Sequence, residues 1–329
     1  MSFSFSSLPL AQPEEILHDL SPVMLIHKNG RIERLALEET IPPSTDHPTG
    51  VRSKDVQISS KTGLSARLYL PTTNTSQKHN LPLVIYFHGG GFVVGRASGT
   101  LFQPFLNRLA FEANVVVVSV DYRRAPEHPL PTAYDDSWDA IKWVVSHAAG
   151  NGRDPWLTDF VDFKRVFFGG ESSGANIAHQ MAMRIGLEND DQQVKLSGIV
   201  LIHPYFWGDT LIGGEVVADV KERDLMGNIW RVANPDTTGL DDPMINPGSD
   251  ANLWKLGCKR VLVTVAEKDL LRDRGWYYHE VLEKSGWNGN IEIIEAKAEG
   301  HAFHLFTPFC ENALTLFKTL SLFFNEIDQ

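Results

Sequence analysis

The chain has 329 residues, with 30 Lys or Arg against 41 Asp or Glu, so its formal net charge is −11 with neutral histidine. Hydrophobic residues make up 43% and charged residues 22%, the balance of a globular protein with a large core. The acidic balance and the lack of a Lys/Arg run argue against binding to nucleic acid or to an anionic membrane. No apolar stretch reaches the roughly 18 residues of a membrane span.

The cysteine content indicates a reducing compartment. Cys258 and Cys310 are too few for a disulfide framework and have no metal-ligand spacing. Residues 1–12 contain no basic residue and no long apolar run, so they lack the features of a secretory signal. We therefore expect a cytoplasmic protein that needs no metal and no obligate protein partner.

The first part of the chain predicts peripheral elements. A Ser-rich start at residues 2–7 predicts disorder, and Pro13–Leu20 predicts a short amphipathic helix. The polar composition of residues 71–80 predicts a surface loop. Around that loop, Val56–Ser59 and Ser65–Leu70 alternate in hydrophobicity, which favours antiparallel edge strands.

From residue 81 onward, strand and helix patterns alternate, which predicts an α/β fold with a mostly parallel sheet of about eight strands covered on both faces. The six further strands are Leu81–Phe87, Asn114–Val120, Arg165–Phe168, Gly198–Ile202, Arg260–Ala266 and Ile291–Glu295. The predicted helices are Phe102–Ala113, Ser137–His147, Gly174–Leu187, Arg274–Ser285 and Asn312–Phe324. Between Tyr205 and Trp254 the alternation breaks. There we expect an insertion over the carboxyl end of the sheet, with one helix around Leu225–Val232.

A Gly-x-Ser-x-Gly pattern, Gly170–Gly174, follows one of these strands and precedes a helix. In that context the pattern indicates a nucleophile elbow, which lifts the Ser172 hydroxyl clear of the sheet, whereas the alternative is a structural turn. The N-terminus of the following helix offers free N–H groups to a developing anion.

A second glycine-rich segment, His88–Phe92, directly follows the strand Leu81–Phe87. Three consecutive glycines, Gly89, Gly90 and Gly91, make sense where backbone N–H groups must approach a ligand closely. A loop of this kind, together with the N–H of Ser173 after the nucleophile, forms an oxyanion hole. The alternatives are a phosphate loop, for which no Gly-Lys-Ser/Thr follows, and a plain turn.

A nucleophilic serine requires a base and an acid that orients the base, in the chain order Ser, Asp or Glu, His. Asp269 follows the strand Arg260–Ala266, and His301 precedes the last helix. We therefore predict Ser172, Asp269 and His301 as the triad. The rival acids are Glu267 and Asp273, and the rival base is His304.

Other conspicuous residues receive structural or provisional interpretations. The charged segment Asp121–Pro129 is interpreted as a network that braces the glycine loop. His179 is interpreted as a packed or solvated side chain. Five aromatic residues are predicted to line an apolar substrate pocket, with core packing as the alternative: Phe92, Tyr205, Phe206, Trp207 and Trp230.

Taken together, the sequence resembles the plant carboxylesterases of the hormone-sensitive-lipase group over nearly its whole length. The matching stretches are Asn29–Arg34, Tyr86–Phe92, Asp121–Pro129, Gly174–His179 and Leu282–Trp287. The resemblance implies a single α/β-hydrolase domain over residues 1–329, with cap elements at about 8–27 and 205–254. It implies the same triad, and an oxyanion hole built from the N–H groups of Gly90, Gly91 and Ser173.

The resemblance implies a carboxylic ester hydrolase that acts on small to medium apolar esters through an acyl-enzyme, without a cofactor. In one respect the chain departs from many family esterases, because Glu171 stands where they have Asp. The Glu171 form also resembles the 2-hydroxyisoflavanone dehydratases, which typically carry Thr at the nucleophile position. A hydro-lyase or a cyclase acting on a plant secondary metabolite is therefore the alternative. A hormone-receptor-like binder is disfavoured, because the gibberellin receptors of the family lack the catalytic histidine, whereas this chain has His301.

Overall fold

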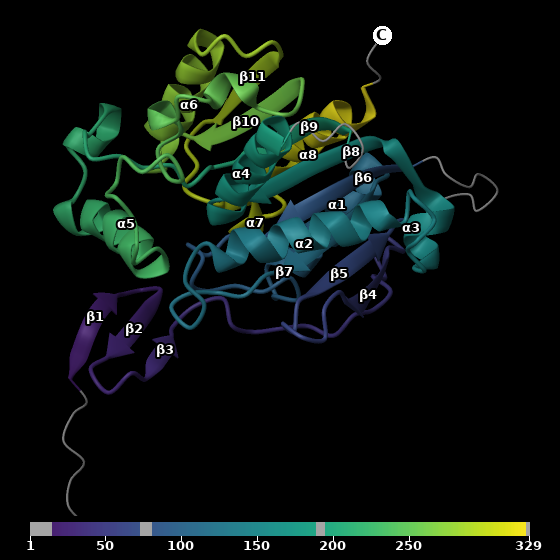
Figure 1. Cartoon of the computed structure of the whole chain (residues 1–329), viewed down its shortest axis with the longest axis horizontal. Helices are drawn as coiled ribbons and strands as arrows, with labels where there is room; N and C mark the ends of the chain where they lie inside the picture. Colours follow the sequence, from purple (N-terminus) through teal and green to yellow (C-terminus); the bar gives the residue numbers. More distant parts are fainter. Residues whose placement is uncertain (1–14, 73–80, 189–194, 327–329) are drawn as a thin grey trace, which may run out of the picture.

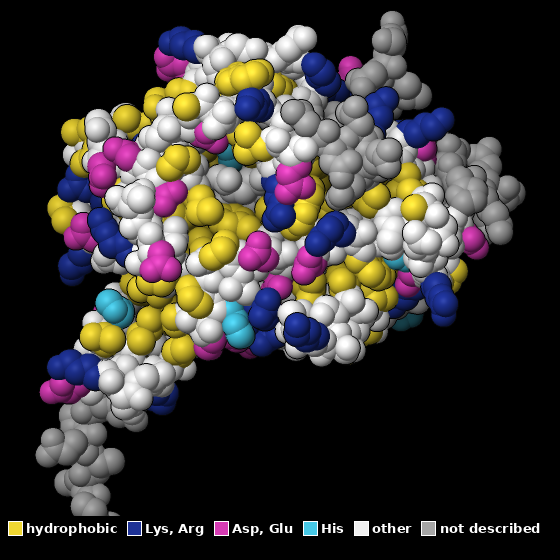
Figure 2. Space-filling view, viewed as in Figure 1, with side chains coloured by type: hydrophobic (Ala, Val, Ile, Leu, Met, Phe, Trp, Pro, Cys, Tyr) yellow, Lys and Arg dark blue, Asp and Glu magenta, His cyan; other side chains and the backbone are white. Residues whose placement is uncertain are grey.

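The computed structural model describes residues 15–72, 81–188 and 195–326. The predicted Ser-rich disorder at 2–7 and most of the predicted loop at 71–80 therefore lie outside the described residues. No helix in the described ranges combines the length and apolarity needed to cross a bilayer. On the face shown in Figure 2, basic and acidic side chains are interspersed.

An eight-stranded sheet runs through the centre of the molecule (Figure 1), as the alternation of strand and helix patterns predicts. Its spatial order is β11-β10-β9-β8-β6-β7-β5-β4. The six strands from β11 to β7 in that order are mutually parallel, whereas β5 and the edge strand β4 are antiparallel to their neighbours. The bounds are β4 Arg52–Gln57, β5 Ser65–Leu70, β6 Leu81–Phe87, β7 Val116–Asp121, β8 Val161–Glu171, β9 Leu196–Ile202, β10 Arg260–Ala266 and β11 Asn290–Ala296.

Helices cover both faces of this sheet, so its central strands are continuous apolar runs. In β6, Ile85 and Phe87 pack toward α2 (Thr132–Ser146) and α4 (Ser173–Glu188), while Val84 and Tyr86 pack toward the opposite face. The opposite face is covered by α1 and α8, and the first face also carries α6. The remaining bounds are α1 Phe102–Ala113, α3 Pro155–Phe160, α6 Arg272–Lys284, α7 Phe303–Phe306 and α8 Glu311–Asn325.

The N-terminal segment forms a small antiparallel sheet, so the predicted helix over Pro13–Leu20 is wrong for its described residues. The strands are β1 (Ile16–Leu20), β2 (Met24–His27) and β3 (Ile32–Arg34). The local pattern fits an amphipathic helix, but β1 pairs with β2, which supplies backbone partners that the pattern cannot show. Leu20 and Met24 then turn into the core.

The insertion at residues 205–254 contains α5 (Val220–Ala233), which includes the predicted helix around Leu225–Val232, and three short 3-10 helices. These are η1 (Gly213–Val216), η2 (Pro247–Ser249) and η3 (Leu253–Lys255). Strand β1 contacts α5, and Figure 1 shows the small N-terminal sheet beside this helix. The two segments predicted as cap elements therefore lie side by side where they are described.

Candidate active site

Ser172 occupies the tight turn between β8 and α4. Its φ of +54° lies in the left-handed region, which a nucleophile elbow imposes on its central residue. The turn is held from both sides, because Ser172 N donates to Ile202 O at 2.9 Å and Tyr205 N donates to Ser172 O at 3.0 Å. A Cβ at Gly174 would collide with the backbone of Phe87, so only glycine fits there.

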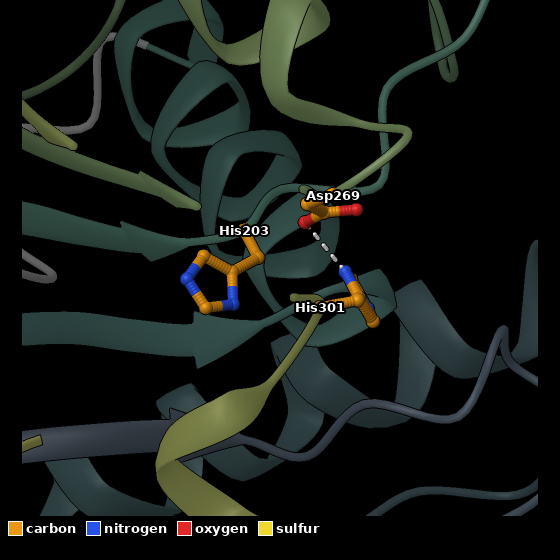
Figure 3. A group of neighbouring side chains, drawn as sticks. All are labelled: His203, Asp269 and His301. Atoms are coloured by element: carbon orange, nitrogen blue, oxygen red, sulfur yellow. Dashed lines mark hydrogen bonds and ion pairs between the residues drawn. The ribbon is translucent and has the colours of Figure 1, made fainter. Parts of the chain in front are cut away.

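Asp269 and His301 form a hydrogen-bonded pair at the carboxyl ends of β10 and β11. His301 Nδ1 lies 2.8 Å from Asp269 Oδ2, and Figure 3 shows the ring directed at the carboxylate. Burial alone would raise the pKa of Asp269, but the charge and hydrogen bond of His301 hold it below its usual value. Loss of water likewise favours a lower pKa for His301, but Asp269 outweighs this effect and raises the pKa.

The glycine loop at residues 88–92 presents its backbone to the same region. Gly90 and Gly91 have φ values of +112° and +61°, and a Cβ at Gly90 would strike the backbone of Val94. Within the described ranges, the N–H groups of Gly90, Gly91 and Ser173 donate to no protein acceptor. These three N–H groups are available to a ligand oxygen.

Glu171, the residue before the nucleophile, is buried and joins the elbow to the glycine loop. Its carboxylate accepts hydrogen bonds from the N–H of Gly89 and from the hydroxyl of Tyr86. Burial raises the pKa of Glu171 to about 7, although both hydrogen bonds act in the opposite direction. The sequence singles out Glu171 as unusual, but its contact with the glycine loop emerges only from the tertiary structure.

The segment Asp121–Pro129 braces the glycine loop, as the sequence predicts. Tyr122 donates from its hydroxyl to His88 O at 2.7 Å, and its ring stacks on His88 with 4.2 Å between centroids. Ala125 N donates to Phe92 O at 3.0 Å, and Asp121 accepts from Ala97 N at 2.9 Å. The two ends of the loop are thus tied to one neighbouring segment.

Ser172, Asp269, His301, Gly90 and Gly91 all line one cavity of about 380 Å³. Apolar side chains from the N-terminal segment, α5, α7 and the loops around the site make up most of its wall: Val23, Leu37, Leu101, Leu225, Met226, Ile229, Leu270, Leu271, Leu305 and Phe306. In the described part of the chain, Ser172 and His301 form no hydrogen bond with each other. Catalytic contacts of this kind often tighten only when substrate binds.

The five aromatic residues predicted to line a substrate pocket differ in their position relative to this cavity. Tyr205 lines the cavity, with its hydroxyl donating to Met226 O at 2.5 Å. Phe92, Phe206, Trp207 and Trp230 are instead buried in the core and do not line the cavity. Large aromatic side chains bury much apolar area, so these four pack in the core, and most of the cavity wall is aliphatic. His179 is packed as well, 3.1 Å from the Tyr278 hydroxyl.

His203, which the sequence analysis did not single out, lies beside the Asp269–His301 pair (Figure 3). Ligand atoms of these three residues lie within 4.8 Å of one another, which raises the question of a metal site. A neutral imidazole has one nitrogen lone pair, and in His203 that lone pair accepts the Ala302 N–H at 2.9 Å. Since Asp269 and His301 bind each other, the donor set fits a hydrogen-bonded cluster better than a metal centre. The available sequence signal is the position of His203 directly after the predicted strand Gly198–Ile202.

Comparison with known proteins places this geometry in a family. A family model described as alpha/beta hydrolase fold matches residues 84–305. The chain is 47% identical to the protein named probable carboxylesterase 13 of Arabidopsis thaliana, over 91% of this chain and 94% of the relative. It is 42% identical to a 2-hydroxyisoflavanone dehydratase of Glycyrrhiza echinata, over 97% and 99%.

A solved esterase of Pyrobaculum calidifontis aligns with a TM-score of 0.68 and 30% identity, over 83% of this chain and 84% of that one. The family model and the relatives confirm the resemblance to plant carboxylesterases that the motifs predict. The chain belongs to the α/β-hydrolase family.

Proposed function

We propose that this chain hydrolyses carboxylic esters of small to medium size through an acyl-enzyme on Ser172. The observation that carries the proposal is that one cavity brings together Ser172, the Asp269–His301 pair and the unused N–H groups of the glycine loop. The carboxylesterase relatives and the esterase structure support the same reaction.

In the proposed acylation, the Ser172 hydroxyl attacks the ester carbonyl carbon while His301 Nε2 takes the hydroxyl proton. Asp269 accepts the hydrogen bond from His301 Nδ1, which fixes the tautomer and stabilises the imidazolium. The raised pKa of His301 suits this task, because Asp269 stabilises the positive charge that the imidazole gains when it takes the proton.

The negative charge that forms on the carbonyl oxygen is received by the N–H groups of Gly90, Gly91 and Ser173. Removing one such donor typically costs about 3–4 kcal/mol of transition-state stabilisation. Collapse of the tetrahedral intermediate breaks the ester C–O bond, and His301 returns its proton to the leaving alcohol. Water then attacks the acyl-enzyme by the same route in reverse and releases the acid.

The cavity supports a small to medium, largely apolar ester. Its wall is mostly aliphatic, and a volume of about 380 Å³ lies at the lower end of the range for small-molecule sites. Among the described lining residues, apart from the candidate catalytic set and Glu171, two carry a charge, Glu222 and Lys268, and both are exposed. We place the reaction in the cytoplasm, which the free thiols of Cys258 and Cys310 support.

Ester turnover and active-site labelling test the proposal together. We expect the wild-type chain to hydrolyse p-nitrophenyl acetate or butyrate and to form an adduct with a fluorophosphonate at Ser172. The variants Ser172→Ala and His301→Ala should lose turnover by about 10⁴-fold or more. Ser197→Ala, a serine whose hydroxyl bonds Lys164 O at the amino end of β9, serves as the matched control and should keep normal turnover.

A different outcome identifies the alternative chemistry. The similarity to dehydratases makes elimination the second candidate reaction. If Ser172→Ala keeps most activity on a β-hydroxy ketone while His301→Ala loses it, the chain uses the site as a lyase without an acyl-enzyme. Tight binding of a small molecule without any turnover would instead indicate a receptor.

A further inference from the structure

We propose that His203 is a positioning residue for the reaction: it holds the backbone beside His301 and thereby sets the distance between the imidazole and Ser172. The inference rests on the proposed function. It follows from the place of His203 in the sheet and from one hydrogen bond.

His203 follows β9, and β9 lies between β8, which leads to Ser172, and β10, which leads to Asp269. The carboxyl ends of parallel strands meet at one edge of a sheet, so residue 203 lies between the chain segments that carry Ser172 and Asp269. Its own backbone is fixed, because His203 N donates to Thr264 O of β10 at 2.8 Å.

The side chain of His203 makes the link to the third segment. Its Nδ1 accepts the N–H of Ala302, the residue next to His301, at 2.9 Å. Ala302 has a φ of +53°, a conformation that alanine adopts only where its surroundings enforce it. The His203 and His301 rings lie 5.8 Å apart between centroids, so the ring of His203 also backs that of His301.

The same short segment clamps the nucleophile. The carbonyl of Ile202 accepts from Ser172 N, and Tyr205 N donates to Ser172 O. Residues 202–205 therefore hold the backbone of the nucleophile directly, and through the His203 side chain they hold the backbone of the segment that carries His301. The nucleophile Ser172 and the base His301 must be positioned to within a few tenths of an ångström, and the same strand end holds the backbone of both.

A pair of nearly isosteric variants tests this role. In His203→Asn the Oδ1 occupies the place of Nδ1 and still accepts from Ala302 N, whereas His203→Leu has the same branching and no acceptor. Because a misplacement of about 1 Å costs on the order of 100-fold, we expect His203→Leu to lower kcat by about 10- to 100-fold. KM should stay within about 2-fold, since the cavity wall is unchanged.

His203→Asn should recover most of kcat and most of the rate of fluorophosphonate labelling. His203 has a φ of +46°, which Asn tolerates better than Leu, so Tm is measured for each variant and assays are run well below the lower Tm. His304→Leu is the matched control, because His304 is a buried neighbour of His203 whose nitrogens bond no described group. It should keep normal kcat.

Normal kcat in a folded His203→Leu variant would overturn the proposal, as would a His203→Asn variant as slow as His203→Leu. These outcomes are separable from failure of the proposed function, which would show as turnover retained in Ser172→Ala or His301→Ala. Loss of kcat in His304→Leu equal to that in His203→Leu would assign the effect to packing and also overturn the proposal.

Discussion

Gly89 N donates to Glu171 Oε1 over 2.5 Å, so the residue before the nucleophile directly holds the first glycine of the loop at residues 88–92. Both groups are buried, and the second carboxylate oxygen accepts from Tyr86. A buried carboxylate in this position fixes the loop, but its charge is costly away from water. Stability and loop geometry are therefore coupled through one titratable group.

The raised pKa of Glu171 predicts a specific pH dependence of stability. Its pKa is 4.5 in an ordinary environment and about 7 in the folded chain. Between these values the folded chain holds a proton that the unfolded chain has lost, so this group lowers the free energy of unfolding as pH rises from 4.5 to 7. The loss amounts to roughly 3 kcal/mol and should be absent in Glu171→Gln. Urea denaturation of both proteins from pH 4.5 to 8 measures the difference, and parallel curves would contradict this prediction.

Asp269→Asn should change both the rate and its pH profile. Without the carboxylate the wrong imidazole tautomer is favoured, and kcat should fall on the order of 10⁴-fold. Because Asp269 raises the pKa of His301 above 6.5, the acidic limb of kcat/KM should lie above that pH in the wild type and move down in the variant.

Initial rates on a p-nitrophenyl ester from pH 5 to 9 measure this effect. Glu267→Gln is the matched control, since Glu267 is an exposed neighbour that accepts from Ala298 N. An acidic limb that stays in place in Asp269→Asn would show that another group controls the titration.

Ile229 should limit the size of the ester group that fits beside the glycine loop. Its Cγ2 lies only 2.7 Å from the position that a Cβ on Gly91 would take, and it lines the cavity. Ile229→Ala should therefore shift selectivity toward longer or branched esters by on the order of 10-fold in relative kcat/KM.

A series of p-nitrophenyl esters from acetate to octanoate measures the shift. Ile141→Ala is the matched control, because Ile141 is equally apolar and buried in α2 but does not line the cavity. The same chain-length profile in both variants would contradict a role of Ile229 in selectivity.

The buried pair Arg274–Glu215 should anchor the insertion at residues 205–254 to α6. Arg274 Nε and Glu215 Oε1 are 2.6 Å apart, and both side chains are almost fully buried. Removing one partner leaves an unpaired buried charge, so Glu215→Leu should lower the free energy of unfolding by about 3–5 kcal/mol. The double variant Glu215→Leu with Arg274→Met should recover much of this loss, as urea denaturation will show. A double variant less stable than Glu215→Leu alone would contradict the prediction.

Local sequence patterns predict most of the sheet. In β6, every residue is apolar because both faces are covered, and a continuous apolar run bounded by turn residues is readable without the fold. The same holds for the positions of Ser172, Asp269 and His301, because each follows a predicted strand, and the carboxyl ends of parallel strands converge. Chain order and strand polarity alone therefore bring these residues to one edge.

Contacts between distant segments decide the rest. The local pattern over β1 predicts a helix, whereas in the structure these residues pair with β2 as a strand. Trp207 and Trp230 are predicted to line a pocket, with core packing as the alternative, and the structure buries both in the core. The link from His203 to Ala302 spans 99 residues, and that from Gly89 to Glu171 spans 82. A local pattern carries the periodicity of one element, whereas a hydrogen bond between loops depends on how several elements pack, so only the tertiary structure reveals it.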